Sequence, residues 1–225
     1  MLDNERQTKI VSVLGIPRCD IAYYMIRLLN TYNKDVLVID NSEDHSLFSS
    51  FKKVEGEEVI AIGHIWVMYD RAMDEEFFRD FDAVVVFHST RIDQPLLDNS
   101  DVMYLISDYN PHNIKKIAGK LEAIEEKYFF HVIMVDQITN KYSDNSIIKE
   151  LGLLKEQVVS FSTVFLNESD AFCYINFMRS GSQQIKNASA ELKEILKPVL
   201  SQIYPEEPVK ELNKIFKKAL TGKIR

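Results

Sequence analysis

The chain has few of the residues that form cross-links and flexible loops. Its 225 residues include two cysteines, six prolines and seven glycines. Cys19 and Cys173 are far apart and have no CxxC partner or neighbouring His pair, which argues against a disulfide framework and a zinc site. No linker rich in Ser, Gly or Pro and no internal repeat interrupts the chain, which favours one compact domain.

An excess of basic residues and long apolar runs are also missing. The formal net charge is -7, which argues against general binding to nucleic acid. The apolar runs are broken by charges before they reach membrane-spanning length, and the polar start MLDNERQTKI differs from a secretory signal. We therefore expect a cytoplasmic protein.

The sequence does contain a regular alternation of two patterns. Short runs rich in Val and Ile predict strands buried on both faces, at residues 9–14, 35–40, 82–87, 101–106 and 130–136. Amphipathic stretches predict helices, at residues 20–32, 113–127 and 146–155. This order predicts an α/β fold with a doubly wound, mainly parallel sheet.

Other segments add to this frame. Residues 54–70, with Gly63 between two β-like pieces, predict an extra hairpin or edge strand before a short helix at 75–79. After the run VVSFS we expect helices at 169–178 and 182–203. Pro95 predicts a turn, and the loop after residue 106 predicts a helix cap at Asn110. Large aromatics such as Trp66, Phe77, Phe78 and Phe81 favour the core, although the alternation HIWVMY suggests an exposed edge.

The loop GIPRCD follows the first strand and precedes the first helix. A phosphate-binding loop at this position needs glycines, a lysine for the terminal phosphates and a Ser or Thr for magnesium. This loop has one glycine, one proline and no lysine.

The segment KIVSVLGIPRCDIAYYMIRLLNTYNKDVLVID resembles the opening of the MinD/ParA family of deviant Walker A ATPases, whose pattern is a strand, KGGVGKTT, a helix and a VLVIDxD strand. Without gaps, Gly15 falls on a loop glycine, Pro17 on the last glycine, Arg18 on the phosphate lysine and Cys19 on the magnesium-binding Thr. Asp40 then closes the second strand as in the family. The resemblance implies a P-loop NTPase-like fold.

Further family positions have also changed. Val13 stands on the signature lysine, Ser42 on the second Asp of VLVIDxD and Phe87 on the magnesium-linked Asp. We therefore expect a pseudo-ATPase, because little remains to neutralise charge on a transferred phosphoryl group. The Arg18 fork suits a phosphate, but Asp20 is an acceptable N-cap whose charge would repel one. The expectation is no cofactor, or weak binding of ATP or ADP at most.

The resemblance implies a noncatalytic localisation or assembly factor. Altered loops of this kind occur in proteins resembling TadZ/CpaE, so the implied partners are a pilus, secretion or partitioning component and a second copy of the chain. Two alternatives stay open. One is a nucleotide-binding switch that uses Arg18 in place of the lysine. The other is an enzyme with unrelated chemistry that uses Asp40, His88 or Cys19 at the strand edge.

The chain ends in a basic segment, and we divide it into an α/β domain at 1–204 and a helix at 205–225. The predicted helix carries Val209, Leu212, Phe216 and Leu220 on one face, with basic residues such as Lys217 and Lys218 beside them. A basic amphipathic helix can contact an anionic membrane surface or a partner groove, as the tail helix of MinD-type proteins does. It can equally pack its apolar face on the domain. The five histidines show no metal-ligand spacing.

Overall fold

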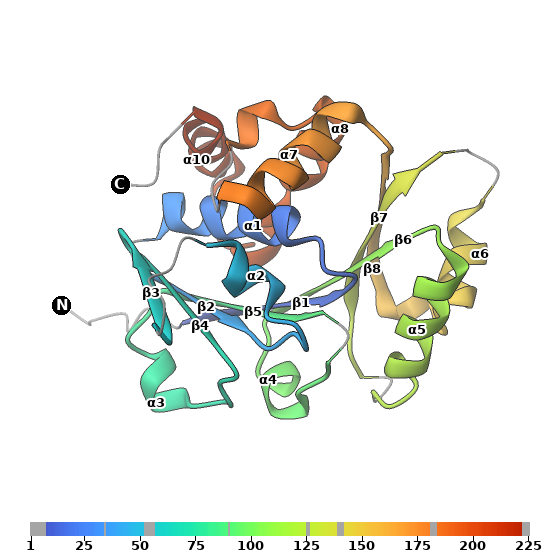
Figure 1. Ribbon diagram of the computed structural model, residues 1–225, viewed down its shortest axis with the longest axis horizontal. Helices are drawn as coiled ribbons and strands as arrows, with labels where there is room; N and C mark the ends of the chain where they lie inside the picture. The colour runs from blue at the N-terminus through green and yellow to red at the C-terminus, as the bar shows by residue number, and fades with distance from the viewer. Residues whose placement is uncertain are drawn as a thin grey trace.

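An eight-stranded sheet runs through the protein in the order β3-β4-β2-β5-β1-β6-β7-β8 (Figure 1). The computed structural model describes residues 8–33, 35–51, 57–89, 91–124, 127–138, 142–180 and 184–221. The strands are β1 (Lys9–Gly15), β2 (Val36–Asp40), β3 (Val59–Ile62), β4 (Ile65–Tyr69), β5 (Ala83–Ser89), β6 (Val102–Asp108), β7 (Phe130–Gln137) and β8 (Val158–Phe165). Neighbouring strands are parallel except β3 and β4, which are antiparallel. The expected α/β class with a mainly parallel sheet is confirmed.

Helices cover both faces of the sheet (Figure 1). On one face lie α1 (Cys19–Tyr32), α2 (Ser46–Ser50), α7 (Glu168–Ser180), α8 (Ala190–Leu196), α9 (Val199–Ile203) and α10 (Val209–Thr221). On the other lie α3 (Glu75–Phe78), α4 (Gln94–Asp98), α5 (Pro111–Leu121) and α6 (Asp144–Glu150). Two short 3-10 turns, η1 (Lys155–Gln157) and η2 (Ile185–Asn187), complete the chain. This doubly covered sheet explains why its central strands are apolar along their whole length.

The helix α1 is the most enclosed helix of the protein's first half. Every residue from Cys19 to Leu29 is buried, because the sheet lies on one side and α7 and α10 lie on the other. Tyr23 stacks on Phe177 of α7 with ring centroids 4.6 Å apart, and Phe51 packs against both rings. Aromatic packing of this kind anchors α7 above the start of α1.

Several predicted elements change in detail. The predicted edge hairpin is present as β3 and β4, with Gly63 in the turn at a φ of 60°. Pro95 lies in the first turn of the short helix α4 instead of forming an isolated turn, and Asn110 caps α5 as expected. The predicted helix at 182–203 is broken into η2, α8 and α9, because Ser189 caps a new helix and Pro198 begins another. Residues 181–183 lie outside the described part.

The tail helix α10 packs on the domain. Leu212 and Phe216 are buried in the same core as α1, and Leu220 packs against that core. In this conformation these apolar side chains contact the domain, as the alternative of packing expects. A contact of the helix with a membrane or a partner stays a prediction. Lys217 and Lys218 remain exposed, as does Val209, at 65%. In the described residues no helix is long and apolar enough to cross a membrane.

Candidate functional site

The loop between β1 and α1 lies close to the neighbouring strand β6. Gly15 has a φ of 111°, and a Cβ atom built on it would lie 1.8 Å from the carbonyl oxygen of Ile106. The backbone N–H of Ile16 donates to that same oxygen at 2.9 Å. Gly15 is thus required by the approach of β6. The amide of Ile16 already has an acceptor within the protein, so it is not free for an anion.

Arg18 turns inward at the start of α1. Its Nε and Nη2 atoms both donate to the carboxylate of Asp20 at 2.9 Å, and its Nη1 atom donates to Asp136 at 3.0 Å. Arg18 is 8% exposed and Asp20 is fully buried. Burial works against the charge of Arg18, but the two carboxylates outweigh it and raise the pKa of the guanidinium. This bidentate pair fills the place where the family resemblance puts a phosphate-binding lysine.

Residues from distant parts of the chain cover this ion pair. Asp136, the residue before the end of β7, has a left-handed conformation with a φ of 56°. Tyr174 of α7 lies with its ring centroid 5.4 Å from the guanidinium carbon of Arg18, and its hydroxyl donates to the carbonyl of Pro17 at 3.5 Å. No local pattern in the sequence indicates these partners. They come together only because β7 and α7 pack beside α1.

Asp20 does not cap α1. The N-cap position belongs to Arg18, which makes no side-chain capping bond, and Asp20 lies in the first turn. The expected N-cap at Asp20 is therefore wrong, because its carboxylate is held by Arg18. Asp20 and Asp136 together carry one more negative charge than Arg18 neutralises, so the loop's local charge is unfavourable for a phosphate.

Cys19 and Asp40 support the structure around the loop. Cys19 is fully buried and donates to Ser46 Oγ at 3.4 Å. Burial raises the pKa of its thiol to about 12, which keeps the thiolate scarce at neutral pH. The buried Asp40 accepts from Ser42 Oγ at 2.5 Å and from the backbone N–H of Phe48 at 2.8 Å. Burial raises the pKa of Asp40, while these donors lower it. Asp40 thus holds the loop after β2 in place, and the hydrogen-bond partners of Arg18 are Asp20 and Asp136 instead.

His88 is enclosed at the end of β5. Its Nε2 atom lies 3.0 Å from Ser12 Oγ, which is 2.7 Å from Ser100 Oγ. The imidazole is fully buried, and this burial lowers its pKa to about 3. His88 is therefore neutral and shielded from solvent. This geometry argues against an enzyme that uses His88. The burial and protonation of the Cys19 thiol argue in the same way against an enzyme that uses Cys19.

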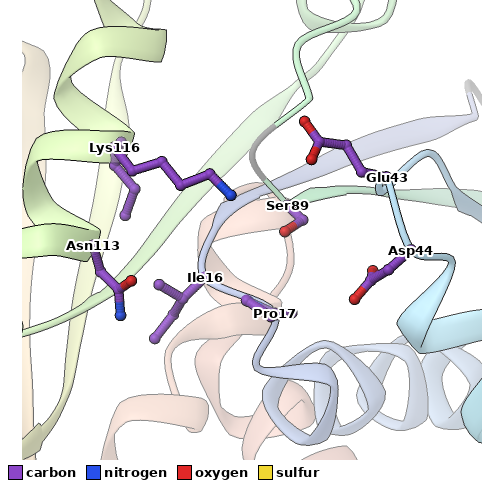
Figure 2. Close-up of a pocket in the computed structure, with 8 residues that line it drawn as sticks. Ile16, Pro17, Glu43, Asp44, Ser89, Asn113 and Lys116 are labelled. Carbon is purple, nitrogen blue, oxygen red and sulfur yellow. The ribbon is translucent and has the colours of Figure 1, made fainter.

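A small polar cavity opens beside the loop, at the carboxyl ends of β1, β2 and β5 (Figure 2). Its volume is about 160 Å³, and its lining includes Ile16, Pro17, Glu43, Asp44, Ser89, Asn113 and Lys116. The Lys116 side chain extends from α5 toward Ser89, while Glu43 and Asp44 lie on the opposite side. Arg18 does not line this cavity. These polar residues were not predicted, although Glu43 and Asp44 follow the end of β2 and Ser89 ends β5, where α/β proteins bind ligands.

This cavity differs from a nucleotide site in size and charge. Drug-sized ligands usually occupy roughly 300–1,000 Å³, which is more than the 160 Å³ found here. Two carboxylates face one ammonium group across it. In the ranges that the structure describes, no group of three or more His, Cys, Asp or Glu side chains could hold a metal ion.

The fold is similar to known ATPases. No family model matches the chain, and no curated protein matches its sequence. The structure of a ParA family ATPase from Chlorobium tepidum TLS is similar with a TM-score of 0.57 at 13% identity, over 96% of this chain and 98% of that one. The MinC:MinD cell division protein complex of Aquifex aeolicus is similar with a TM-score of 0.53 at 12% identity, over 97% and 98% of the two chains. This likeness, together with the sheet order and the loop after β1, shows that the chain has the MinD/ParA type of P-loop NTPase fold.

Proposed function

We propose that this protein is a noncatalytic localisation or assembly factor, related in function to the MinD/ParA ATPases. It would use the fold as a docking platform. One observation carries the proposal. Arg18, at the position of the phosphate lysine, is bound by the carboxylates of Asp20 and Asp136 and covered by Tyr174. A nucleotide phosphate would have to displace two carboxylates from a buried guanidinium.

The free energy of the buried ion pair favours the internal partner over a phosphate. Breaking a buried ion pair by removing one partner typically costs about 3–5 kcal/mol. A phosphate binding to Arg18 would leave Asp20, which is fully buried, without its main cationic partner. The backbone around Gly15 offers little compensation, since the Ile16 amide is bonded to Ile106. Binding energy from a nucleotide would therefore be spent on rearranging the loop.

A protein partner is the second half of the proposal. The solved MinD neighbour is in complex with MinC, and an analogous partner for this chain would be a component of a pilus, secretion or partitioning system. The resemblance to TadZ/CpaE-like proteins motivates that choice. A nucleotide-independent platform would hold such a partner without a cycle of binding and release.

The first experiment is isothermal titration calorimetry of the intact protein with ATP and with ADP, each with and without magnesium. We expect no saturable heat and no thermal shift. Saturable micromolar binding that is lost in Arg18→Ala would overturn the proposal in favour of a nucleotide-binding switch. Lys116→Ala is the matched control, because binding lost only in that variant would place the nucleotide in the adjacent cavity.

The localisation half needs a separate test. A fluorescent fusion of the full chain, imaged in its own cells, should gather at a defined site. Uniform fluorescence at native expression would contradict a localisation role, whatever the calorimetry shows.

A further inference from the structure

The strand β8 is an unusual outer strand. It forms one edge of the sheet and pairs only with β7 among the described residues. Its eight residues, VVSFSTVF, include no charged residue and no proline. Natural edge strands are commonly protected by charges, proline, bulges or short length. β8 has one irregularity, between Val158 and Ser160, and from Ser160 to Thr163 it pairs regularly with β7. The opposite edge, β3, is only four residues long and follows Glu57 and Glu58.

The backbone of β8 offers hydrogen-bonding groups on its open side. The N–H of Leu166 donates to Gln137 of β7, while the N–H of Phe165 points the other way and donates to Glu191. Backbone groups alternate between the two sides of a strand. The N–H and C=O groups of Phe161 and Thr163 therefore lie on the side of Phe165, away from β7.

We propose that a second copy of this chain pairs with β8 in antiparallel orientation, on a two-fold axis that passes near Ser162. In this register Phe161 of each copy exchanges backbone hydrogen bonds with Thr163 of the other. Phe161 and Thr163, which face outward, lie on either side of Ser162. A two-fold axis at Ser162 therefore sets Phe161 of one copy opposite Thr163 of the other, and the edge is complementary to itself. The two sheets then continue as one across the axis.

The charges around β8 favour a second copy over a charged partner strand. Because the strand carries no charge, two copies can lie side by side without like charges meeting along it. Lys155 and Glu156 precede β8, whereas Glu168 and Glu191 lie at its carboxyl end. Lys155 and Glu156 together carry no net charge, so antiparallel pairing sets no net like charge against the acidic end of the other copy.

Apolar side chains near the edge add to this surface. Val159 is 57% exposed, Leu166 is 56% exposed and Phe165 is 36% exposed. Pairing of two β8 strands would cover part of this apolar area, which favours association. The proposed contact uses the open side of β8 and none of Arg18, Asp20, Asp136 and Tyr174, so it requires no nucleotide and goes beyond the proposed function.

The test is the mass of the full chain in solution without nucleotide, measured by light scattering and sedimentation between about 1 and 100 µM, a range that brackets typical weak and moderate dimers. We expect twice the monomer mass of 26.1 kDa. Thr163→Pro removes an N–H from the open side and none from the β7 ladder, so it should weaken the dimer at least tenfold. Thr163→Ala is the matched control: it loses only the side-chain contact with Tyr109 and should stay dimeric.

A cross-linking variant keeps the proposal testable if Thr163→Pro does not fold. Ser162→Cys should form a disulfide between copies under mild oxidation, because residues opposite each other in a non-hydrogen-bonded pair lie within disulfide range. The native Cys19 and Cys173 are buried and give little background. Ala61→Cys, exposed on the opposite edge strand β3, is the control. A monomeric wild type, a dimer unaffected by a folded Thr163→Pro, or cross-linking no better at Ser162 than at Ala61 would each overturn the proposal.

Discussion

Arg18 stands at the position where the family resemblance puts a phosphate-binding lysine, but its side chain binds a carboxylate of the same chain. Its register matches that of a phosphate-binding lysine, but its planar fork fits the Asp20 carboxylate with two bonds of 2.9 Å. A lysine has no such fork. In this structure the cation is paired with an internal carboxylate at the position where the resemblance puts a phosphate-binding lysine.

The first prediction follows from this burial. Arg18→Ala leaves the fully buried Asp20 without its cation, so the free energy of unfolding should fall by about 3–5 kcal/mol. Urea denaturation at pH 7 measures the change. The double variant Arg18→Met with Asp20→Asn removes both charges and should recover most of the loss. A loss below about 1 kcal/mol in Arg18→Ala would mean that the pair is not formed in solution.

The second prediction concerns the buried neutral His88. Its pKa falls from an ordinary value of 6.5 to about 3 on folding, so below pH 6.5 the unfolded chain binds a proton that the folded chain does not. Stability from this group is therefore lost as pH falls from about 6.5 toward 3. His131 has a pKa lowered by burial and acts in the same direction, whereas the raised pKa of Asp40 acts in the opposite direction.

A comparison with His88→Gln isolates this contribution. Between pH 7 and pH 4.5 the wild type should lose about 2 kcal/mol more of its unfolding free energy than the variant, as the linkage relation gives for a shift of this direction and size. Urea denaturation at both pH values provides the measurement. Equal losses in the two proteins would show that His88 is protonated or exposed in the folded state.

At the scale of elements, the position of α10 distinguishes two roles of a basic amphipathic helix, which are packing on its own domain and contact with a membrane or partner. Phe216 is 8% exposed and packs in the core shared with α1. Phe216→Ala should therefore lower the free energy of unfolding by about 3 kcal/mol, through lost burial and a cavity. The exposed neighbour provides the control, since Lys217→Ala should change stability by no more than about 0.5 kcal/mol. If the two variants are equally stable, α10 is undocked in solution and its apolar face is free for a membrane or partner.

The sequence predicts elements best where burial is complete. The strands β1, β2, β5, β6 and β7 are apolar on both faces and were predicted, because two covered faces leave little room for polar side chains. β8 was not assigned as a strand, since its edge position tolerates Ser and Thr and its apolar pattern is weak. The position of Arg18 could be predicted from the family register. Its contact with Asp136 spans 118 residues and depends on where β7 lies in the sheet, which no local spacing encodes.

At the scale of the whole molecule, the residues that the resemblance links to ATP hydrolysis are lost at several strand ends. Val13 and Phe87 are fully buried in the core around α1, and the Ser42 hydroxyl donates to Asp40. Phe87 stands where the resemblance expects a magnesium-linked carboxylate. Because Ser42 and Phe87 lie outside the loop, changes in the loop alone should not produce ATP hydrolysis.

The last prediction tests this distributed loss. A variant carrying Pro17→Gly, Arg18→Lys, Cys19→Thr and Asp20→Thr matches the last four positions of KGGVGKTT but leaves Val13, Leu14, Ser42 and Phe87 in place. We expect no phosphate release from ATP above the wild type, because no carboxylate at the end of β5 would hold magnesium against the charge that develops on the phosphoryl group. Circular dichroism checks the fold, and calorimetry measures binding separately. Binding without turnover would mean that Arg18 and its partners prevent nucleotide binding in the wild type. It would also mean that residues at the other strand ends prevent catalysis. Magnesium-dependent turnover would instead place the whole defect in the loop.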